Sequence, residues 1–197
     1  MSSRNKILSA VATNQPEFVP LPDISTFKGN KEQVLERFIT VLTAIGGTAY
    51  NVKDWIDIKE IITKGYNVQE QRIISLVPEL EDVATHAYEI NPAAHYLADV
   101  KLAIIQAHIA VAENGAVWVT EELMGHRGLP FICQHLAVIV ATSAIVATMH
   151  EAYAFIADNE FGFGTFIAGP SKTADIEQSL VLGAHGPCSM TVFLLSS

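Results

Sequence analysis

Charged side chains are scarce in this chain of 197 residues. Asp, Glu, Lys and Arg make up 17% of it, whereas hydrophobic residues make up 50% and the mean hydropathy is +0.29. With only 12 glycines and 8 prolines, the composition excludes a disordered or collagen-like chain. The uncharged stretch from Gly128 to His150 is strongly apolar only from Leu136 on, over about 14 residues, whereas a membrane span needs about 20. We therefore expect one soluble, unusually apolar domain.

Basic residues are scarcer than acidic ones, 12 against 21, which gives a formal charge of −9. Such a surface repels phosphate backbones and anionic lipids, so nucleic-acid binding is not expected. The N-terminal residues show no apolar signal-peptide core or cleavage site, which favours a cytoplasmic protein. After residue 101 the chain has eight acidic residues but only two basic ones, Arg127 and Lys172. These two are the candidate cationic anchors for an anion.

Cysteine is also rare, and several familiar motifs are absent. Cys133 and Cys188 lie far apart without a Cys-x-x-Cys pair, which excludes a Cys-ligated iron–sulfur or zinc site formed by this chain alone. We expect two buried free thiols and no metal site. Gly162-Phe-Gly164 lacks the third glycine of a dinucleotide fingerprint, and Lys172 comes too late after Gly164 for a phosphate-binding loop.

Hydrophobic periodicity predicts an N-terminal arm over residues 1–28 and a single α/β domain over residues 29–197. The arm is a short helix followed by a proline-containing linker, and we expect it to pack on the domain or on a partner. In the first half of the domain we expect a helix from about Asn30 to Gly46, a strand at 48–52, a helix capped by Asp54, and a strand at 72–77.

The second half is richer in apolar strands. Asn114-Gly115 between two apolar runs predicts a hairpin with a type I′ turn, in which both residues have positive φ. After a strand over 136–142, Ser143 is expected to cap a helix that reaches Ile156. A strand then ends at Ala168, and a short helix is expected up to about Leu180, before the last strand at 190–195. Apolar strands alternating with helices predict a layered mixed sheet with helices on both faces.

The segment Gly169-Pro-Ser-Lys-Thr-Ala-Asp-Ile-Glu177 is the densest in chemical groups. A strand ending before a rigid Gly-Pro turn would place Ser171, Lys172 and Thr173 at the carboxyl end of the sheet, where α/β folds bind ligands. Asp175 and Glu177 would repel an anion there unless they point away or hold a cation. A second turn, Gly183-Ala-His-Gly-Pro187, could bring His185 to the same place.

Together with Ile109-Ala-Val-Ala-Glu-Asn-Gly115 and the stretch from Leu129-Pro130 to Val140, these motifs resemble the LUD domain family, and within it the lactate-utilisation protein C type. The resemblance covers residues 104–195. It departs from the family pattern at Asn114 and Ala116, where the family has threonines, and at Lys172, where the family has arginine. Lysine keeps the charge but loses the bidentate fork for a carboxylate.

The resemblance implies a fold similar to the sugar-isomerase and CoA-transferase-like (NagB/RpiA) superfamily. It also implies cytoplasmic oxidation of L-lactate to pyruvate, with iron–sulfur clusters on cysteine-rich partner subunits and no cofactor held by this chain. Glu113 or His185 would then transfer a proton. The small carboxylate would be bound by residues of the three motifs and by Arg127: Asn114, Gly115, Arg127, Gly169, Ser171, Lys172, Thr173, Asp175 and Glu177.

Two other functions are compatible with the sequence. One is a stand-alone CoA-transferase-like or cyclo-ligase-like enzyme with a phosphorylated or nucleotide-linked substrate. Such substrates need several basic groups, and the second half of the chain has two. The other is a non-catalytic module that docks on iron–sulfur partners through an apolar surface.

Overall fold

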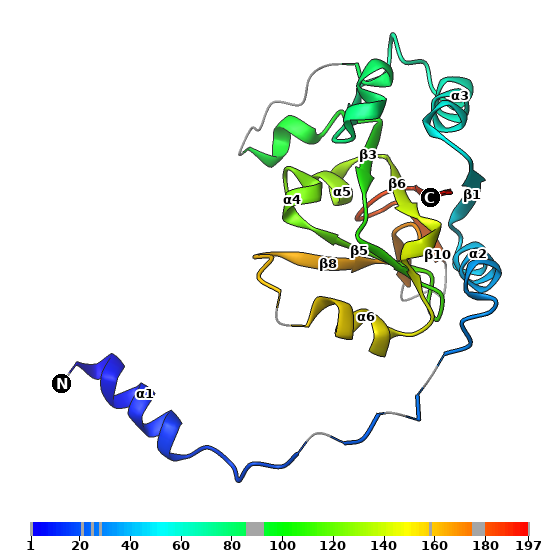
Figure 1. The fold of residues 1–197 in the computed structure, drawn as a ribbon. Helices are drawn as coiled ribbons and strands as arrows, with labels where there is room; N and C mark the ends of the chain where they lie inside the picture. Colours follow the sequence, from blue (N-terminus) through cyan, green and yellow to red (C-terminus); the bar gives the residue numbers. More distant parts are fainter. Residues whose placement is uncertain are drawn as a thin grey trace.

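The computed structural model describes every residue except 1, 21, 25, 28, 86–92, 158, 175–179 and 197. Helix α1 (Ser3–Thr13) has no buried side chain and stands away from the rest of the molecule (Figure 1). The chain reaches the body near Phe27, whose ring stacks on His150 with 5.1 Å between ring centroids. The arm was expected to pack on the domain or on a partner. Among its described residues, only the end of its linker packs on the domain.

Within the described residues, the body contains two sheets, five α-helices, three 3₁₀ helices and one additional hairpin. In chain order the elements are α2 (Val34–Ala44), β1 (Thr48–Val52), α3 (Trp55–Gly65), β2 (Ile73–Ser75), the 3₁₀ helices η1 (Pro78–Val83) and η2 (Ala94–Leu97), β3 (Leu102–Gln106), β4 (Ile109–Val111), β5 (Ala116–Thr120), α4 (Glu121–Met124), α5 (Leu129–Ile132), β6 (His135–Ala141), η3 (Thr142–Ala144), β7 (Ile145–Val146), α6 (Met149–Ile156), β8 (Gly164–Ile167), β9 (Lys172–Ala174), β10 (Leu180–Leu182) and β11 (Ser189–Leu195).

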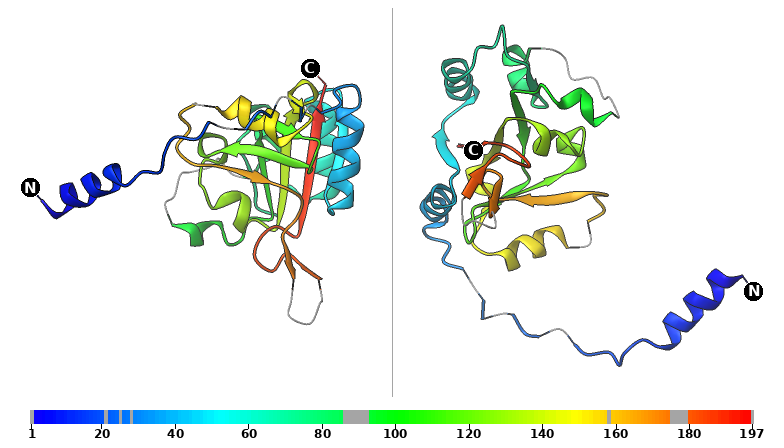
Figure 2. Two further views of the ribbon diagram at one scale, coloured as in Figure 1. Left: turned by 90° about the horizontal axis from the view of Figure 1, so that it is seen from below. Right: turned by 180° about the vertical axis from the view of Figure 1, so that it is seen from behind.

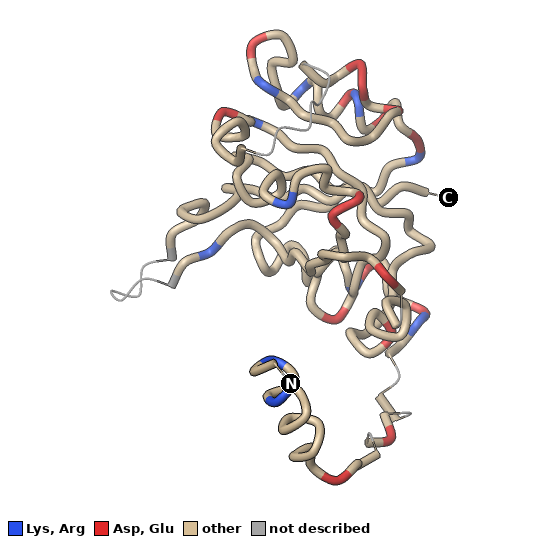
Figure 3. The backbone as a smooth tube through the Cα atoms, turned by 90° about the vertical axis from the view of Figure 1, so that its left-hand side faces the viewer, with Lys and Arg blue, Asp and Glu red and all other residues tan. Residues whose placement is uncertain are grey.

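The main sheet has five strands in the order β1-β11-β6-β3-β2, and every neighbouring pair is parallel. Its inner strands β3, β6 and β11 are largely apolar because both faces are covered there, whereas the edge strand β1 is mostly exposed. In β6, Ala137 and Ile139 pack toward α3 and η1, whereas Leu136, Val138 and Val140 pack into the core on the opposite face. The charged residues accordingly lie mainly on helices and loops (Figure 3).

The second sheet, in the order β7-β4-β5-β8, covers that opposite face beside α2, and α6 covers its outer side (Figure 2). Its β4–β5 and β5–β8 pairs are antiparallel. The sequence predicts one mixed sheet, whereas the structure has two sheets. The main sheet is wholly parallel, and only the second is mixed, because β4 pairs in parallel with β7. The apolar run from Ile104 to Ala112 divides at Ala107, whose N–H donates to Ile139 in the main sheet, and His108, whose N–H donates to Trp118 in the second sheet.

The hairpin at Asn114-Gly115 forms, but its turn is not of type I′. Only Gly115 of this pair has a positive φ, +69°, and its N–H donates to the carbonyl oxygen of Val111 over 2.9 Å. Asn114 does not have a positive φ. Its side-chain oxygen instead accepts from the N–H of Ala116, which forms an Asx turn.

Two expected helices also differ. Helix α6 is capped by Thr148 rather than Ser143, because Thr148 accepts from the N–H of Glu151 and the Glu151 carboxylate accepts from Ala147, a capping-box arrangement. Where a helix was expected after Gly169-Pro170, β9 and β10 instead pair as an antiparallel hairpin, with Thr173 opposite Val181. No helix in the described part of the chain is long and apolar enough to cross a membrane.

Candidate functional site

The candidate site begins where β8 ends at the Gly169-Pro170 turn. Gly169 has a φ of +71°, and a Cβ at this position would lie 3.0 Å from the backbone oxygen of Ile45. A side chain there would be strained and would also crowd the end of α2. Glycine therefore allows the chain to turn closely against α2 before it enters β9.

The turn expected at Gly183–Pro187 lies directly beside this segment. The Ser171 N–H donates to the carbonyl oxygen of Pro187 over 2.9 Å, and the Gly183 N–H donates to the carbonyl oxygen of Ser171 over 3.0 Å. A Cβ at Gly186 would lie 3.0 Å from the Cβ of Ser171. The loop at residues 169–171 and the loop at residues 183–187 are therefore in direct contact, and the hairpin β9–β10 connects them in sequence.

Lys172 and His185, one from each loop, line the same pocket of about 320 Å³. Ser171 and Gly169 line it as well, and Phe131 and Phe166 supply apolar walls. None of the described lining residues is acidic, so the pocket combines one ammonium, one hydroxyl and one imidazole without an opposing carboxylate. This arrangement suits a small anion that has further hydrogen-bonding groups.

The other predicted site residues are distributed differently. Gly115 does not line the pocket, but it packs against the same end of α2 as Gly169: Cβ atoms at Gly115 and Gly169 would both approach the Cδ1 atom of Ile45, at 3.2 and 3.3 Å. The Asn114 side chain is engaged within its own turn. Thr173 donates from its hydroxyl to the carbonyl oxygen of Val181 within the hairpin. Asp175 and Glu177 lie outside the described residues.

Glu113 and Arg127 do not line the pocket of Lys172. The Glu113 carboxylate accepts from the N–H of Met149 over 2.7 Å, at the N-terminus of α6. Arg127 pairs with Glu121 over 2.6 Å, its guanidinium lies over the ring of Phe163, and it lines a separate surface hollow. Of the two cations in the second half of the chain, the structure brings only Lys172 to the candidate site.

A second polar cluster was missed by the sequence analysis. The His135 imidazole lies 2.7 Å from the Ser189 hydroxyl, and the ring of Tyr66 meets that of His135 edge-on. Burial, and secondarily the charge of Lys101, lower the pKa of His135. Burial also raises the pKa of Tyr66, an effect that a side-chain hydrogen bond with Ser189 partly offsets. The sequence indicated this cluster only by a histidine at the start of a buried strand. Its partners Tyr66, Lys101 and Ser189 are distant in sequence, so no local motif marked the site.

The two cysteines differ in their surroundings. Cys133 is buried, and burial raises the pKa of its thiol to about 12, so it is protonated at neutral pH and poorly suited to bind a metal. Cys188 is exposed, which corrects the expectation of two buried thiols. Among the described residues, no group of three or more His, Cys, Asp or Glu side chains is placed to hold a metal ion.

Comparison with known proteins gives two kinds of relative. Lactate utilization protein C of Geobacillus sp. strain WCH70 is 31% identical over 125 residues, which are 59% of this chain and 52% of that protein. The protein of the same name from Geobacillus thermodenitrificans strain NG80-2 is 37% identical over 87 residues, which are 41% of this chain and 36% of that protein. This chain thus spans about half or less of the length of these relatives.

The crystal structure of a DUF162 family protein from Deinococcus radiodurans superposes with a TM-score of 0.62 at 16% identity, over 84% of this chain and 98% of that one. At this identity the similarity concerns the fold alone. A sequence model of the LUD domain matches residues 84–195, which include both loops of the candidate site. Because this match extends over more than half of the sequence, the chain belongs to the LUD domain family.

Proposed function

We propose that this protein is a subunit of a cytoplasmic lactate-utilisation system and takes part in the oxidation of L-lactate to pyruvate together with iron–sulfur partner subunits. The names of its relatives support the pathway. The parallel sheet with both faces covered is compatible with a relationship to the sugar-isomerase and CoA-transferase-like superfamily. The observation that carries the proposal is the pocket shared by Lys172 and His185.

In this proposal the pocket binds the carboxylate of a small hydroxy acid. Lys172 neutralises the carboxylate, and the Ser171 hydroxyl lies beside it to donate or accept a hydrogen bond. His185, from the opposite loop, receives the proton of the substrate hydroxyl. The C2–H bond breaks as well, so the oxidation releases a second proton, which passes to water, and two electrons, which pass to the iron–sulfur clusters of the partners.

The surface beside the pocket supports a partner there. Hairpin β9–β10 projects from the body (Figure 2), and Val181 and Leu182 on β10 are 44% and 50% exposed. Phe131, a wall of the pocket, is 40% exposed. Exposed apolar side chains of this kind mark interaction sites when they lie together. A partner docked on the hairpin would stand next to the site of oxidation.

A phosphorylated or nucleotide-linked substrate is less compatible with this pocket. Lys172 is the single Lys or Arg among its described lining residues, whereas several phosphates need several cations or backbone N–H groups. The structure places Arg127 elsewhere, paired with Glu121.

The proposal is tested by calorimetric titration of the full chain with L-lactate, pyruvate, ATP and CoA. We expect the two carboxylates to bind, and Lys172→Met to weaken their binding about tenfold or more, because a charge-assisted hydrogen bond is lost. Lys31→Met, which removes a lysine outside the pocket, serves as the matched control. In the source organism, the Lys172→Met variant should fail to restore growth on L-lactate. Equal affinity in both variants, or tight binding of ATP or CoA alone, would refute the proposal.

A further inference from the structure

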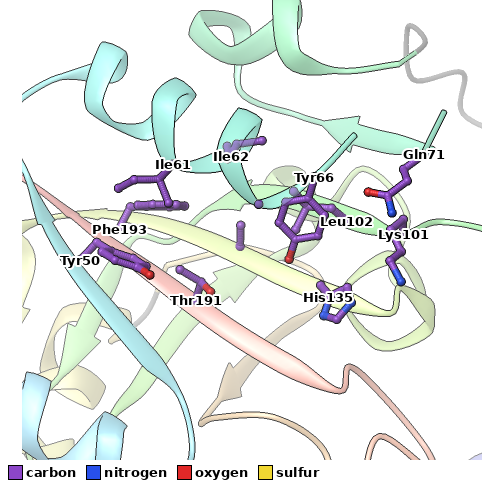
Figure 4. Close-up of a pocket in the computed structure, with 12 residues that line it drawn as sticks. Tyr50, Ile61, Ile62, Tyr66, Gln71, Lys101, Leu102, His135, Thr191 and Phe193 are labelled. Carbon is purple, nitrogen blue, oxygen red and sulfur yellow. The ribbon is translucent and has the colours of Figure 1, made fainter. Parts of the chain in front are cut away.

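A second pocket, of about 330 Å³, lies between the end of α3 and the amino-terminal halves of β3, β6 and β11 (Figure 4). Its volume is at the lower end of the range for small-molecule sites, about 300–1,000 Å³. Two small residues line it: Ala137 on β6, and Gly65 at the end of α3, where a Cβ would meet no atom within 4 Å.

One end of the pocket is aromatic and apolar. The rings of Tyr50 and Phe193 are stacked with 5.8 Å between their centroids, and Ile61 of α3 lies beside Phe193 at the same end (Figure 4). Phe193 is buried, whereas Tyr50 is 41% exposed and forms part of the rim. Flat faces next to an open space favour another ring as occupant, since offset stacking adds to the burial of apolar area.

The other end of the pocket gathers polar groups. Figure 4 shows the hydroxyl of Tyr66, the imidazole of His135 and the ammonium of Lys101 at this end. Lys101 donates to the side-chain oxygen of Gln134 over 2.9 Å, which uses one of its three N–H groups. Among the described lining residues Lys101 is the single charged one. In a protein with a net charge of −9, such a pocket selects for an anion.

The close pair of His135 and Ser189 raises the alternative of a nucleophile and its base. Two observations argue against catalysis of this type. Burial, and secondarily the charge of Lys101, lower the pKa of His135, which makes the imidazole a weaker base. In addition, no carboxylate among the described residues lining the pocket is available to orient the ring. The cluster is therefore suited to binding rather than to activation of Ser189.

From this arrangement we propose that the second pocket binds a small aromatic monocarboxylate. The carboxylate lies between Lys101, His135 and Tyr66, and the ring packs against Phe193 and Tyr50. This site shares no lining residue with the pocket of Lys172, so the inference is independent of the proposed function. Whether or not lactate is the substrate of the Lys172 pocket, the proposal for the second pocket is unchanged.

The test uses the full chain with 3-phenylpropanoate as the probe, compared with acetate and with the uncharged 3-phenylpropan-1-ol. We expect 3-phenylpropanoate to bind at least about tenfold more tightly than either compound, because each of them lacks one of the two recognised parts. NMR titration should also show that the pKa of His135 rises when the probe binds, since a nearby carboxylate favours the imidazolium form.

Two variants separate the two ends of the pocket. Lys101→Met removes the charge, and Gly65→Leu fills the cavity from a position where a side chain can be added without a clash. Each should weaken the binding of 3-phenylpropanoate about tenfold or more. Lys64→Met, on the exposed side of α3, and Lys31→Met, outside both pockets, are the controls and should leave it unchanged. The proposal is overturned if the probe does not bind, if it binds without changing the pKa of His135, or if the controls weaken binding as much as the pocket variants.

Discussion

Glu113, which the sequence offers as a candidate proton carrier, provides the sharpest test of how this fold is stabilised. Its carboxylate extends from the β4–β5 turn to the N-terminus of α6 and accepts the N–H of Met149 over 2.7 Å. The two other capping hydrogen bonds do not involve Glu113. The Thr148 hydroxyl accepts from the N–H of Glu151, and the Glu151 carboxylate accepts from the N–H of Ala147. Removal of Glu113 therefore exposes one helix N–H to water and leaves the other caps in place.

The expected cost follows from that single interaction. Loss of a side-chain cap typically destabilises a protein by about 1 kcal/mol, and the charge of a carboxylate near a helix N-terminus contributes about 0.3–1 kcal/mol. We therefore expect Glu113→Ala to lower the free energy of unfolding by about 1 kcal/mol. Glu113→Gln keeps an acceptor oxygen and loses only the charge, so its cost should be about half as large.

Urea unfolding measures both variants. Trp118, which is buried beneath α6 on the second sheet, is a suitable fluorescence probe. High salt should reduce the difference between Glu113→Gln and the wild type, because salt screens the charge. The reasoning is wrong if Glu113→Ala leaves the stability unchanged while it weakens L-lactate binding as strongly as Lys172→Met. Glu113 would then belong to the anion site.

Three further results are expected. Gly169→Ala should destabilise the protein by about 1–2 kcal/mol in urea unfolding because of its positive φ and the close Ile45 oxygen, whereas Gly65→Ala, in open space at the end of a helix, should not. A thiol reagent at neutral pH should modify Cys188 rapidly and Cys133 only after unfolding, since Cys133 is buried and burial raises its pKa to about 12. Because the pKa of His135 is lowered in the folded state, NMR should place it below about 6.5, and its contribution to stability should be lost as the pH falls below that value.

Much of the fold follows from short-range signals in the sequence. Asp54 caps α3 as expected, with its carboxylate accepting the N–H groups of Ile56 and Asp57. The first strand, Thr48–Val52, has the expected bounds. These elements were predictable because the cap, the periodicity and the breaker all lie within a few residues of one another.

The errors arose where tertiary partners decide the outcome. Nothing in the apolar run around Ala107 and His108 shows that the chain leaves one sheet for another, because both residues simply continue to pair along strands. Ser143 and Thr148 are both good caps by residue type. The choice of Thr148 depends on Glu151 and on Glu113, which comes from a different hairpin.

The two pockets show why one site was accessible to sequence reasoning and the other was not. Lys172 and His185 belong to loops that flank one hairpin, so their proximity follows from local chain reversal. Tyr66, Lys101 and His135 come together only because β3 and β6 pair in parallel with Leu102 opposite His135, and α3 covers both strands. Parallel pairing requires a long crossover, so the register that aligns these residues leaves no short-range pattern. Lys101 directly precedes the part of the chain in which cations are scarce, so composition does not single it out, although the fold places it at the amino end of the central strands.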